Sequence, residues 1–110
     1  MKKKSVLTLI IIFGIILLSF AILNKPHPDI EKETAQCIGQ NSVLYIQLGC
    51  HACETQEKMF GNNYQHLNVV DCFFEKEKCQ NIKYTPTWII NNKKYQGVQD
   101  IDKLKELTNC

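Results

Sequence analysis

The sequence predicts a small α/β domain behind an N-terminal membrane-spanning helix, and three observations lead to this fold class. An apolar run covers Val6–Leu23. The remainder alternates between short apolar runs typical of strands and amphipathic runs typical of helices. A Cys-x-x-Cys motif, from Cys50 to Cys53, stands where a predicted strand gives way to a predicted helix. With 110 residues, the chain has room for one small domain and an anchor.

The apolar run has the length of a membrane-spanning helix. Its 18 residues carry no charge, and as a helix they extend about 27 Å, against a hydrocarbon core of roughly 30 Å. Lysines at positions 2–4 precede it, so the N-terminus is expected inside and the rest of this single-pass protein outside the cytoplasm. The alternative to an anchor over residues 1–23 is a secretory signal cleaved near Ser19–Ala21. Both interpretations place the domain outside the cytoplasm.

Charge and cysteine content restrict the class of function. The chain has 13 lysines, no arginine and 11 acidic residues, and three of the lysines precede the apolar run. The remainder therefore has no basic excess for binding nucleic acid. Six cysteines in so short a chain indicate an oxidising compartment.

The elements follow one another in a simple order. Residues 24–36 are polar, include two prolines and His27, and are predicted to be a solvated linker, with a short helix after Pro28 as an alternative for its second half. The domain is predicted to span 37–110 and to contain, in order, a strand (43–48), a helix (52–60) stopped by 61–63, a strand (67–73), a charged helix or loop covering the sheet (75–83), a hairpin (87–90 and 93–97, turned by Asn91-Asn92) and a helix (100–107). We expect the first two strands to be parallel, because a helix joins them, and the hairpin to be antiparallel.

Two helices show an apolar face. The face of the first is predicted to consist of Ala52, Cys53, Gln56, Met59 and Phe60. The face of the last is predicted to consist of Ile101, Leu104 and Leu107, with Asp100 as its N-terminal cap. His66 is expected at the surface before the second strand.

The Cys-x-x-Cys motif is the candidate catalytic site. A cysteine at a helix N-terminus is favoured as the thiolate by the unpaired N–H groups and the helix dipole, so Cys50 is predicted to attack. Cys53, one turn later, is predicted to resolve the mixed disulfide. A protonated His51 would add positive charge near Cys50, while Glu54 and Glu57 would oppose it.

The order of elements, with Cys-x-x-Cys after the first strand and Thr85-Pro86 before the hairpin, resembles the thioredoxin fold. This is a βαβαββα arrangement around a mixed sheet. The resemblance implies a cis peptide bond before Pro86 that faces the dithiol. It also implies that Thr85 and Pro86 shape the groove that binds the substrate.

Three further segments resemble the thioredoxin-like partner domains of vitamin K epoxide reductase homologues: Asp71-Cys72, the run 86–91 and the run 95–98. This resemblance implies a thiol–disulfide oxidoreductase without a cofactor, acting on protein thiols and disulfides. Its partner would be a quinone-linked membrane protein, either a vitamin K epoxide reductase homologue or a DsbB-like protein. The sequence departs from the family at Gly49, which replaces an aromatic residue, and in the inner dipeptide His51-Ala52. Because that dipeptide tunes the reduction potential, the direction of electron flow stays open.

The other four cysteines are candidates for structural disulfides. A Cys72–Cys79 bridge is implied by the resemblance and would contribute roughly 2.5 kcal/mol. A Cys37–Cys110 bridge is suggested only by the positions of the two residues at the ends of the domain, and would contribute roughly 4 kcal/mol. Alternatively, Cys37 or Cys110 relays electrons or joins two chains.

Two metal-binding alternatives compete with the redox interpretation. Zinc bound by Cys50, Cys53, Cys72 and Cys79 is disfavoured by the wide spacing of the second pair and by the oxidising compartment. An extracytoplasmic copper(I) carrier would use the Cys50–Cys53 thiolates, but no methionine cluster accompanies them. We therefore predict no bound metal.

Overall fold

The structure is a computed structural model that describes residues 2–23 and 30–110. Helix α1 (Lys2–Leu23) contains the apolar run, and none of its residues is buried. It is long and apolar enough to cross a membrane, a test that a signal sequence also passes. The linker positions 24–29, including His27, lie outside the described residues.

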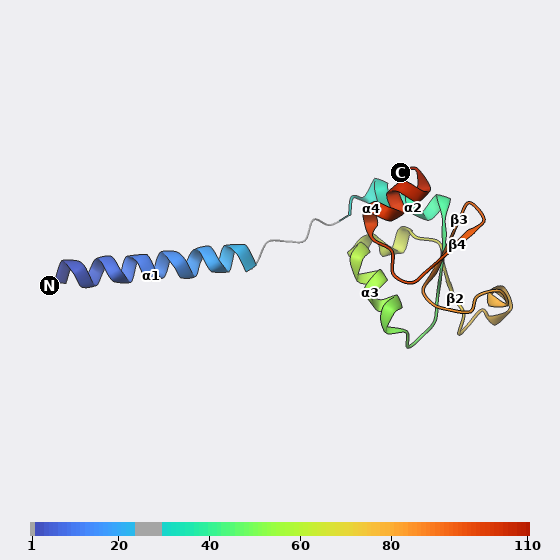
Figure 1. Ribbon diagram of the computed structural model, residues 1–110, viewed down its shortest axis with the longest axis horizontal. Helices are drawn as coiled ribbons and strands as arrows, with labels where there is room; N and C mark the ends of the chain where they lie inside the picture. Colours follow the sequence, from blue (N-terminus) through green and yellow to red (C-terminus); the bar gives the residue numbers. More distant parts are fainter. Residues whose placement is uncertain (1, 24–29) are drawn as a thin grey trace.

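The domain contains four strands, three α-helices and two short 3-10 helices in the described residues (Figure 1). In chain order these are α2 (Lys32–Asn41), β1 (Val43–Ile46), α3 (His51–Phe60), η1 (Gly61–His66), β2 (Val69–Asp71), η2 (Lys76–Cys79), β3 (Thr87–Ile90), β4 (Lys93–Gln96) and α4 (Ile101–Thr108). The predicted strands and helices are present with shorter or shifted ends. The domain is thus a mixed α/β structure, as predicted.

The strands form one sheet in the order β2-β1-β3-β4. β1 and β2 are parallel, and β3 pairs antiparallel with both β1 and β4. Asn91 and Asn92 both adopt a positive φ in the hairpin turn, at 51° and 64°. This conformation is favourable for a two-residue turn and is tolerated by asparagine. The predicted parallel pair and the predicted hairpin are both confirmed.

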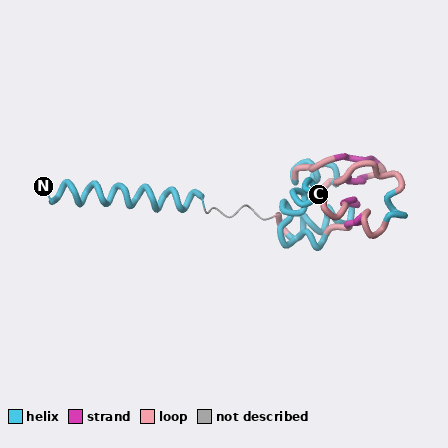
Figure 2. The backbone as a smooth tube through the Cα atoms, turned by 90° about the horizontal axis from the view of Figure 1, so that it is seen from below, coloured by secondary structure: helices cyan, strands magenta, loops and turns pink. Residues whose placement is uncertain are grey.

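The core lies between the sheet and the helices. Because side chains alternate along a strand, Leu44, Trp88 and Ile90 face the helices and are buried there with Phe60 of α3 and Leu104 of α4. Figure 2 shows most of the helical segments gathered on one side of the domain and the strands on the other, with one short helical segment beyond the strands. On the opposite face, part of the charged segment (Glu77, Lys78 and residues 80–82) lines a groove together with Tyr45, Ile89 and Lys94. This part of the charged segment therefore lies beside that face of the sheet.

The first helix of the domain lies partly within the predicted linker. We expected a linker up to Gln36, with a short helix after Pro28 as the alternative; α2 begins at Lys32, and Ile30 and Ala35 are buried in the core. A Cβ at Gly39 of α2 would overlap the backbone carbonyl of His66, so this helix lies directly against η1. The polar residues and prolines of the segment concealed a helix whose apolar side consists of only a few small residues.

Two predicted details of the other helices are also corrected. Ala52 is exposed, because the buried face of α3 begins at Cys53. Asp100 is the N-cap residue of α4, but its side chain makes no capping hydrogen bond. Ile101 and Leu107 pack against the core around Leu104, as expected from their spacing.

Candidate functional site

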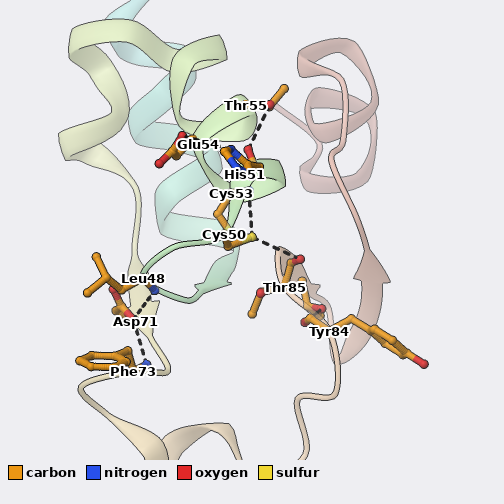
Figure 3. The surroundings of a disulfide bond; sticks show 11 residues. Leu48, Cys50, His51, Cys53, Glu54, Thr55, Asp71, Phe73, Tyr84 and Thr85 are labelled. Atoms are coloured by element: carbon orange, nitrogen blue, oxygen red, sulfur yellow. Dashed lines mark hydrogen bonds and ion pairs between the residues drawn. A yellow bond between two sulfur atoms is a disulfide. The ribbon is translucent and has the colours of Figure 1, made fainter.

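Cys50 lies where the loop after β1 enters α3 (Figure 3). It is the N-cap residue of α3, with an extended backbone conformation. Gly49 before it has φ +87°, although a Cβ there would meet no neighbouring atom. The glycine is therefore required by the backbone conformation, since other residues are strained at such a φ.

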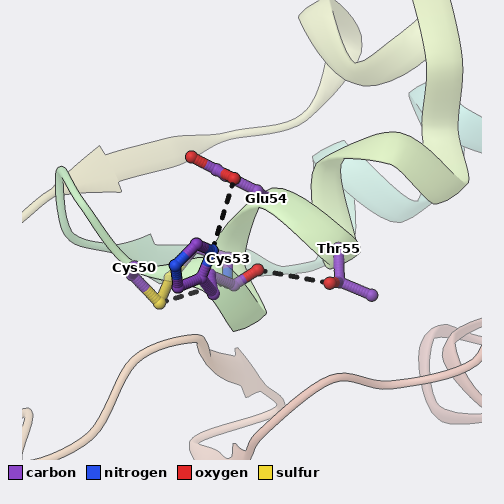
Figure 4. A network of polar contacts seen from close by, with 5 residues as sticks. Cys50, Cys53, Glu54 and Thr55 are labelled. Carbon is purple, nitrogen blue, oxygen red and sulfur yellow. Dashed lines mark hydrogen bonds and ion pairs between the residues drawn. A yellow bond between two sulfur atoms is a disulfide. The ribbon is translucent and has the colours of Figure 1, made fainter.

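The two cysteines of the motif form a disulfide with their Cα atoms 5.2 Å apart. The Cys53 backbone N–H donates a hydrogen bond to Cys50 Sγ at 3.1 Å (Figure 4). Cys50 is partly exposed, whereas Cys53 is only 5% exposed. After reduction, Cys50 would keep a backbone donor that stabilises a thiolate, and its sulfur is the more accessible of the two.

The loop before β3 approaches the dithiol from the other side. The Thr85–Pro86 peptide bond is cis, as expected, and the Thr85 carbonyl oxygen lies 3.5 Å from Cys50 Sγ. In the disulfide the sulfur carries no hydrogen, so this becomes a hydrogen bond only with the reduced thiol. Pro86 is buried, and its carbonyl accepts from the Gly97 N–H at 2.8 Å. The structure thus brings Cys50, Cys53, Thr85 and Pro86 together.

His51 lies on the outer side of the motif. Its side chain is fully exposed, and Nδ1 is 3.9 Å from a carboxylate oxygen of Glu54; Figure 3 shows the two residues near each other. When His51 is protonated, the nearby carboxylate offsets part of its positive charge. The predicted electrostatic support for Cys50 from His51 is therefore reduced by its neighbour.

Exposed apolar side chains stand on the loops near the dithiol, and they were not among the predicted site residues. Leu48 precedes the motif, Phe73 follows β2 and Tyr84 precedes Thr85 (Figure 3). Phe74 is also exposed, and its ring packs edge to face against that of Phe73, with centroids 5.0 Å apart. Two adjacent phenylalanines before a charged segment were the available signal in the sequence.

Asp71 connects two loops of the site. One oxygen of its carboxylate, Oδ1, accepts from the Phe73 N–H at 2.9 Å and from the Leu48 N–H at 3.3 Å. Figure 3 shows Asp71 between the residues that carry these groups. In the sequence, Asp71 stood out only as part of the Asp71-Cys72 resemblance. Its contact with Leu48 could not be predicted, because the two residues are 23 positions apart.

Gln56 links α3 to β3 and to the loop at Gln99. It is fully buried, and its side-chain oxygen accepts from Trp88 Nε1 at 3.0 Å and from the Gln99 N–H at 2.7 Å. Its amide nitrogen donates to the Gln99 carbonyl at 3.0 Å. The indication in the sequence was a polar residue on an otherwise apolar helix face, but its partners lie on β3 and in a distant loop.

The remaining cysteines are paired away from the dithiol. Cys37 is joined to Cys110 and Cys72 to Cys79, with Cα–Cα distances of 5.9 and 5.7 Å. The four sulfurs of the zinc alternative thus belong to two separate disulfides. In residues 2–23 and 30–110, no three His, Cys, Asp or Glu side chains are grouped to hold a metal. His66 is half-buried rather than fully at the surface. The sequence matches no protein-family model and no curated protein.

Proposed function

We propose that this protein is a membrane-anchored thiol–disulfide oxidoreductase with a thioredoxin-like domain outside the cytoplasm. The observation that carries the proposal is the asymmetry of the dithiol. Cys50 is partly exposed and accepts the Cys53 N–H at a helix N-terminus, whereas Cys53 is buried behind it. This is the arrangement expected of an attacking and a resolving cysteine.

The reaction is a reversible two-electron exchange. In the oxidising direction, a thiolate of the client protein attacks Cys50 Sγ, the Cys50–Cys53 bond breaks, and Cys53 leaves as a thiolate that takes up a proton. A second client thiolate then attacks the mixed disulfide and displaces Cys50, which becomes the reduced thiol or thiolate. The client loses two electrons and its thiol protons, and the dithiol gains the electrons. The reducing direction is the reverse of these steps.

The loop at Thr85 and Pro86 would guide the client. The Thr85 carbonyl lies against Cys50 Sγ, so an approaching segment must pass next to this loop. The exposed side chains of Leu48, Phe73 and Tyr84 add apolar surface on either side. We expect a flexible client segment with its cysteine in an accessible, extended stretch.

The anchor and the linker determine where the exchange takes place. Helix α1 is long and apolar enough to hold the domain at a membrane, and three lysines at its start favour a cytoplasmic N-terminus. Net turnover needs a second redox protein that restores Cys50 and Cys53. A quinone-linked membrane protein of the vitamin K epoxide reductase or DsbB type would supply or remove two electrons at the same membrane.

Trapping of mixed disulfides tests this function. Cys53→Ala should accumulate mixed disulfides through Cys50, because the resolving thiol is missing. Cys50→Ala should accumulate few, because Cys53 is buried. The measurement is non-reducing electrophoresis and mass spectrometry of the membrane-bound protein, with Cys72→Ser/Cys79→Ser as the matched control. Equal trapping by the two variants would contradict the assigned roles.

The reduction potential of the Cys50–Cys53 couple decides the direction. A value close to about −120 mV is typical of a protein that oxidises thiols, and one close to about −270 mV of a protein that reduces disulfides. Copper(I) titration of the reduced protein is the complementary measurement. Stoichiometric copper binding without any exchange with glutathione would replace the oxidoreductase by the copper carrier.

A further inference from the structure

We propose that Asp71 is a positioning residue that holds the loop carrying Cys50; the inference rests on the proposed function. The carboxylate of Asp71 accepts from the Leu48 N–H at 3.3 Å and from the Phe73 N–H at 2.9 Å, through the same oxygen. Leu48 lies two residues before Cys50. We refer to this pair of hydrogen bonds as the Asp71 clamp.

The backbone of Asp71 is held in place by its own hydrogen bonds. This residue is paired with Ile46 at the end of the parallel β1–β2 ladder, and the Cys72 N–H donates to the Ile46 carbonyl at 2.8 Å. The Asp71 carbonyl accepts from the Phe74 and Glu75 N–H groups at 3.2 and 2.9 Å. Its backbone is therefore held on both sides. The bond to Phe73 belongs to this local turn, whereas the bond to Leu48 crosses to another loop.

The loop that contains Leu48 has little packing of its own, so the clamp matters for its position. The Leu48 side chain is 62% exposed, and a Cβ on Gly49 would find nothing within 4 Å. Packing therefore contributes little to the position of this loop. Besides the clamp, a 3.1 Å bond from the Cys50 N–H to the Gln47 carbonyl closes the turn within the loop. The clamp is the contact that ties the turn to the neighbouring strand.

The position of this loop determines the surroundings of the reactive sulfur. Cys50 Sγ lies 3.1 Å from the Cys53 N–H and 3.5 Å from the Thr85 carbonyl oxygen. Both distances change when the backbone before Cys50 shifts. An acceptor at residue 71 thus influences both the stability of the thiolate and the stability of the disulfide, without contact with the substrate.

Three variants separate the clamp from the other roles of Asp71. Asp71→Asn keeps a side-chain oxygen at the same distance from the backbone and should preserve the clamp. Asp71→Ser has a shorter side chain that supports the local turn with Phe73 but does not reach Leu48. Asp71→Ala removes both bonds. Cys37→Ser/Cys110→Ser is the destabilised control, because it removes a disulfide that shares no residue with the clamp or with the turn after Asp71.

The experiment has two readouts on the full chain in detergent. The first is the amide hydrogen exchange of Leu48 and Phe73, measured by NMR. The second is the equilibrium constant of the Cys50–Cys53 disulfide with glutathione, together with the rate of alkylation of Cys50 after reduction. We expect the serine and alanine variants to exchange the Leu48 amide faster and to change the equilibrium constant or the alkylation rate by about tenfold. The asparagine variant and the cysteine control should stay within about twofold of the wild type.

The proposal is overturned if Asp71→Ser and Asp71→Ala match the wild type in Leu48 exchange and in Cys50 chemistry. It is also overturned if the cysteine control changes Cys50 as much as they do, because the effect then follows general stability. Should the alanine variant not fold, the serine variant supplies both readouts. If the wild-type disulfide does not react with glutathione at all, the proposed function fails, while the Leu48 amide still decides whether the clamp exists.

Discussion

The dithiol region and the Cys37–Cys110 region contain the same covalent bond in opposite settings. Cys50 and Cys53 are three positions apart, at the entrance of α3 and beside three loops. Cys37 and Cys110 are 73 positions apart and join α2 to the residue that follows the C-cap of α4. Breaking the first bond releases a ring of four residues, whereas breaking the second releases the ends of the whole domain.

Several hydrogen bonds surround the Cys37–Cys110 disulfide. Asn109 adopts a left-handed conformation, and the Cys110 N–H then donates to the Lys105 carbonyl at 2.9 Å. Asn41 donates to the Cys37 carbonyl at 2.8 Å, and its nitrogen lies within 4 Å of both sulfurs. We therefore expect the disulfide at the N-terminus of α3 to be the one that exchanges, and the disulfide between α2 and the end of α4 to serve stability.

The largest expected effect that tests this comparison is the loss of Cys37–Cys110. Cys37→Ser/Cys110→Ser should lower the free energy of unfolding by about 4 kcal/mol, because the cross-link no longer restricts a long stretch of unfolded chain. Denaturant unfolding of the oxidised variant measures the loss. Exchange at Cys50 should persist in the folded fraction. Unchanged stability together with lost exchange would indicate an electron relay through these cysteines.

Cys72→Ser/Cys79→Ser should cost less, roughly 2.5 kcal/mol, because the loop that it opens is short. The melting temperature of this variant should fall while exchange at Cys50 continues.

In the wild type, mild reductant should release only the two thiols of Cys50 and Cys53, since structural disulfides resist reduction down to about −300 mV. Mass spectrometry after alkylation counts the thiols, and simultaneous release of four or six would remove the distinction between the two classes of disulfide.

The smallest expected effect concerns Tyr64 in η1. Its hydroxyl is buried without a hydrogen-bond partner among the described residues, and burial, followed by the charges of Glu57 and Asp71, raises its pKa to about 12. The folded protein thus holds this proton more tightly than the unfolded chain, and the associated stability is lost as the pH rises from 10 towards 12.

Tyr64→Phe should therefore be neutral or slightly stabilising at pH 7, within about 1 kcal/mol, because it removes an unsatisfied hydroxyl. Its stability should also decline less than that of the wild type above pH 10. Paired unfolding curves at pH 7 and at alkaline pH provide the comparison. A clear destabilisation at pH 7 would mean that the hydroxyl has a favourable interaction that the structure does not contain.

Much of the site was predictable because its determinants are local. A strand, a glycine, two cysteines and a helix follow one another within 20 positions, so the junction at Cys50 could be located without tertiary structure. The same holds for the hairpin, whose two asparagines favour a positive φ. The first helix of the domain was predicted only as an alternative, because α2 contributes only Ile38 and small residues such as Ala35 to the core.

The sequence by itself determined the order of the elements from β1 to α4, the apolar helix, and the position of the Cys-x-x-Cys motif at the junction of β1 and α3. Only the tertiary structure decided which distant groups surround that site. Thr85 meets Cys50 across 35 positions, Gln56 meets Trp88 across 32, and Asp71 meets Leu48 across 23. The physical reason is that these contacts depend on the strand order β2-β1-β3-β4 and on its register, which bring the ends of neighbouring strands together. Local propensity carries no information on that order.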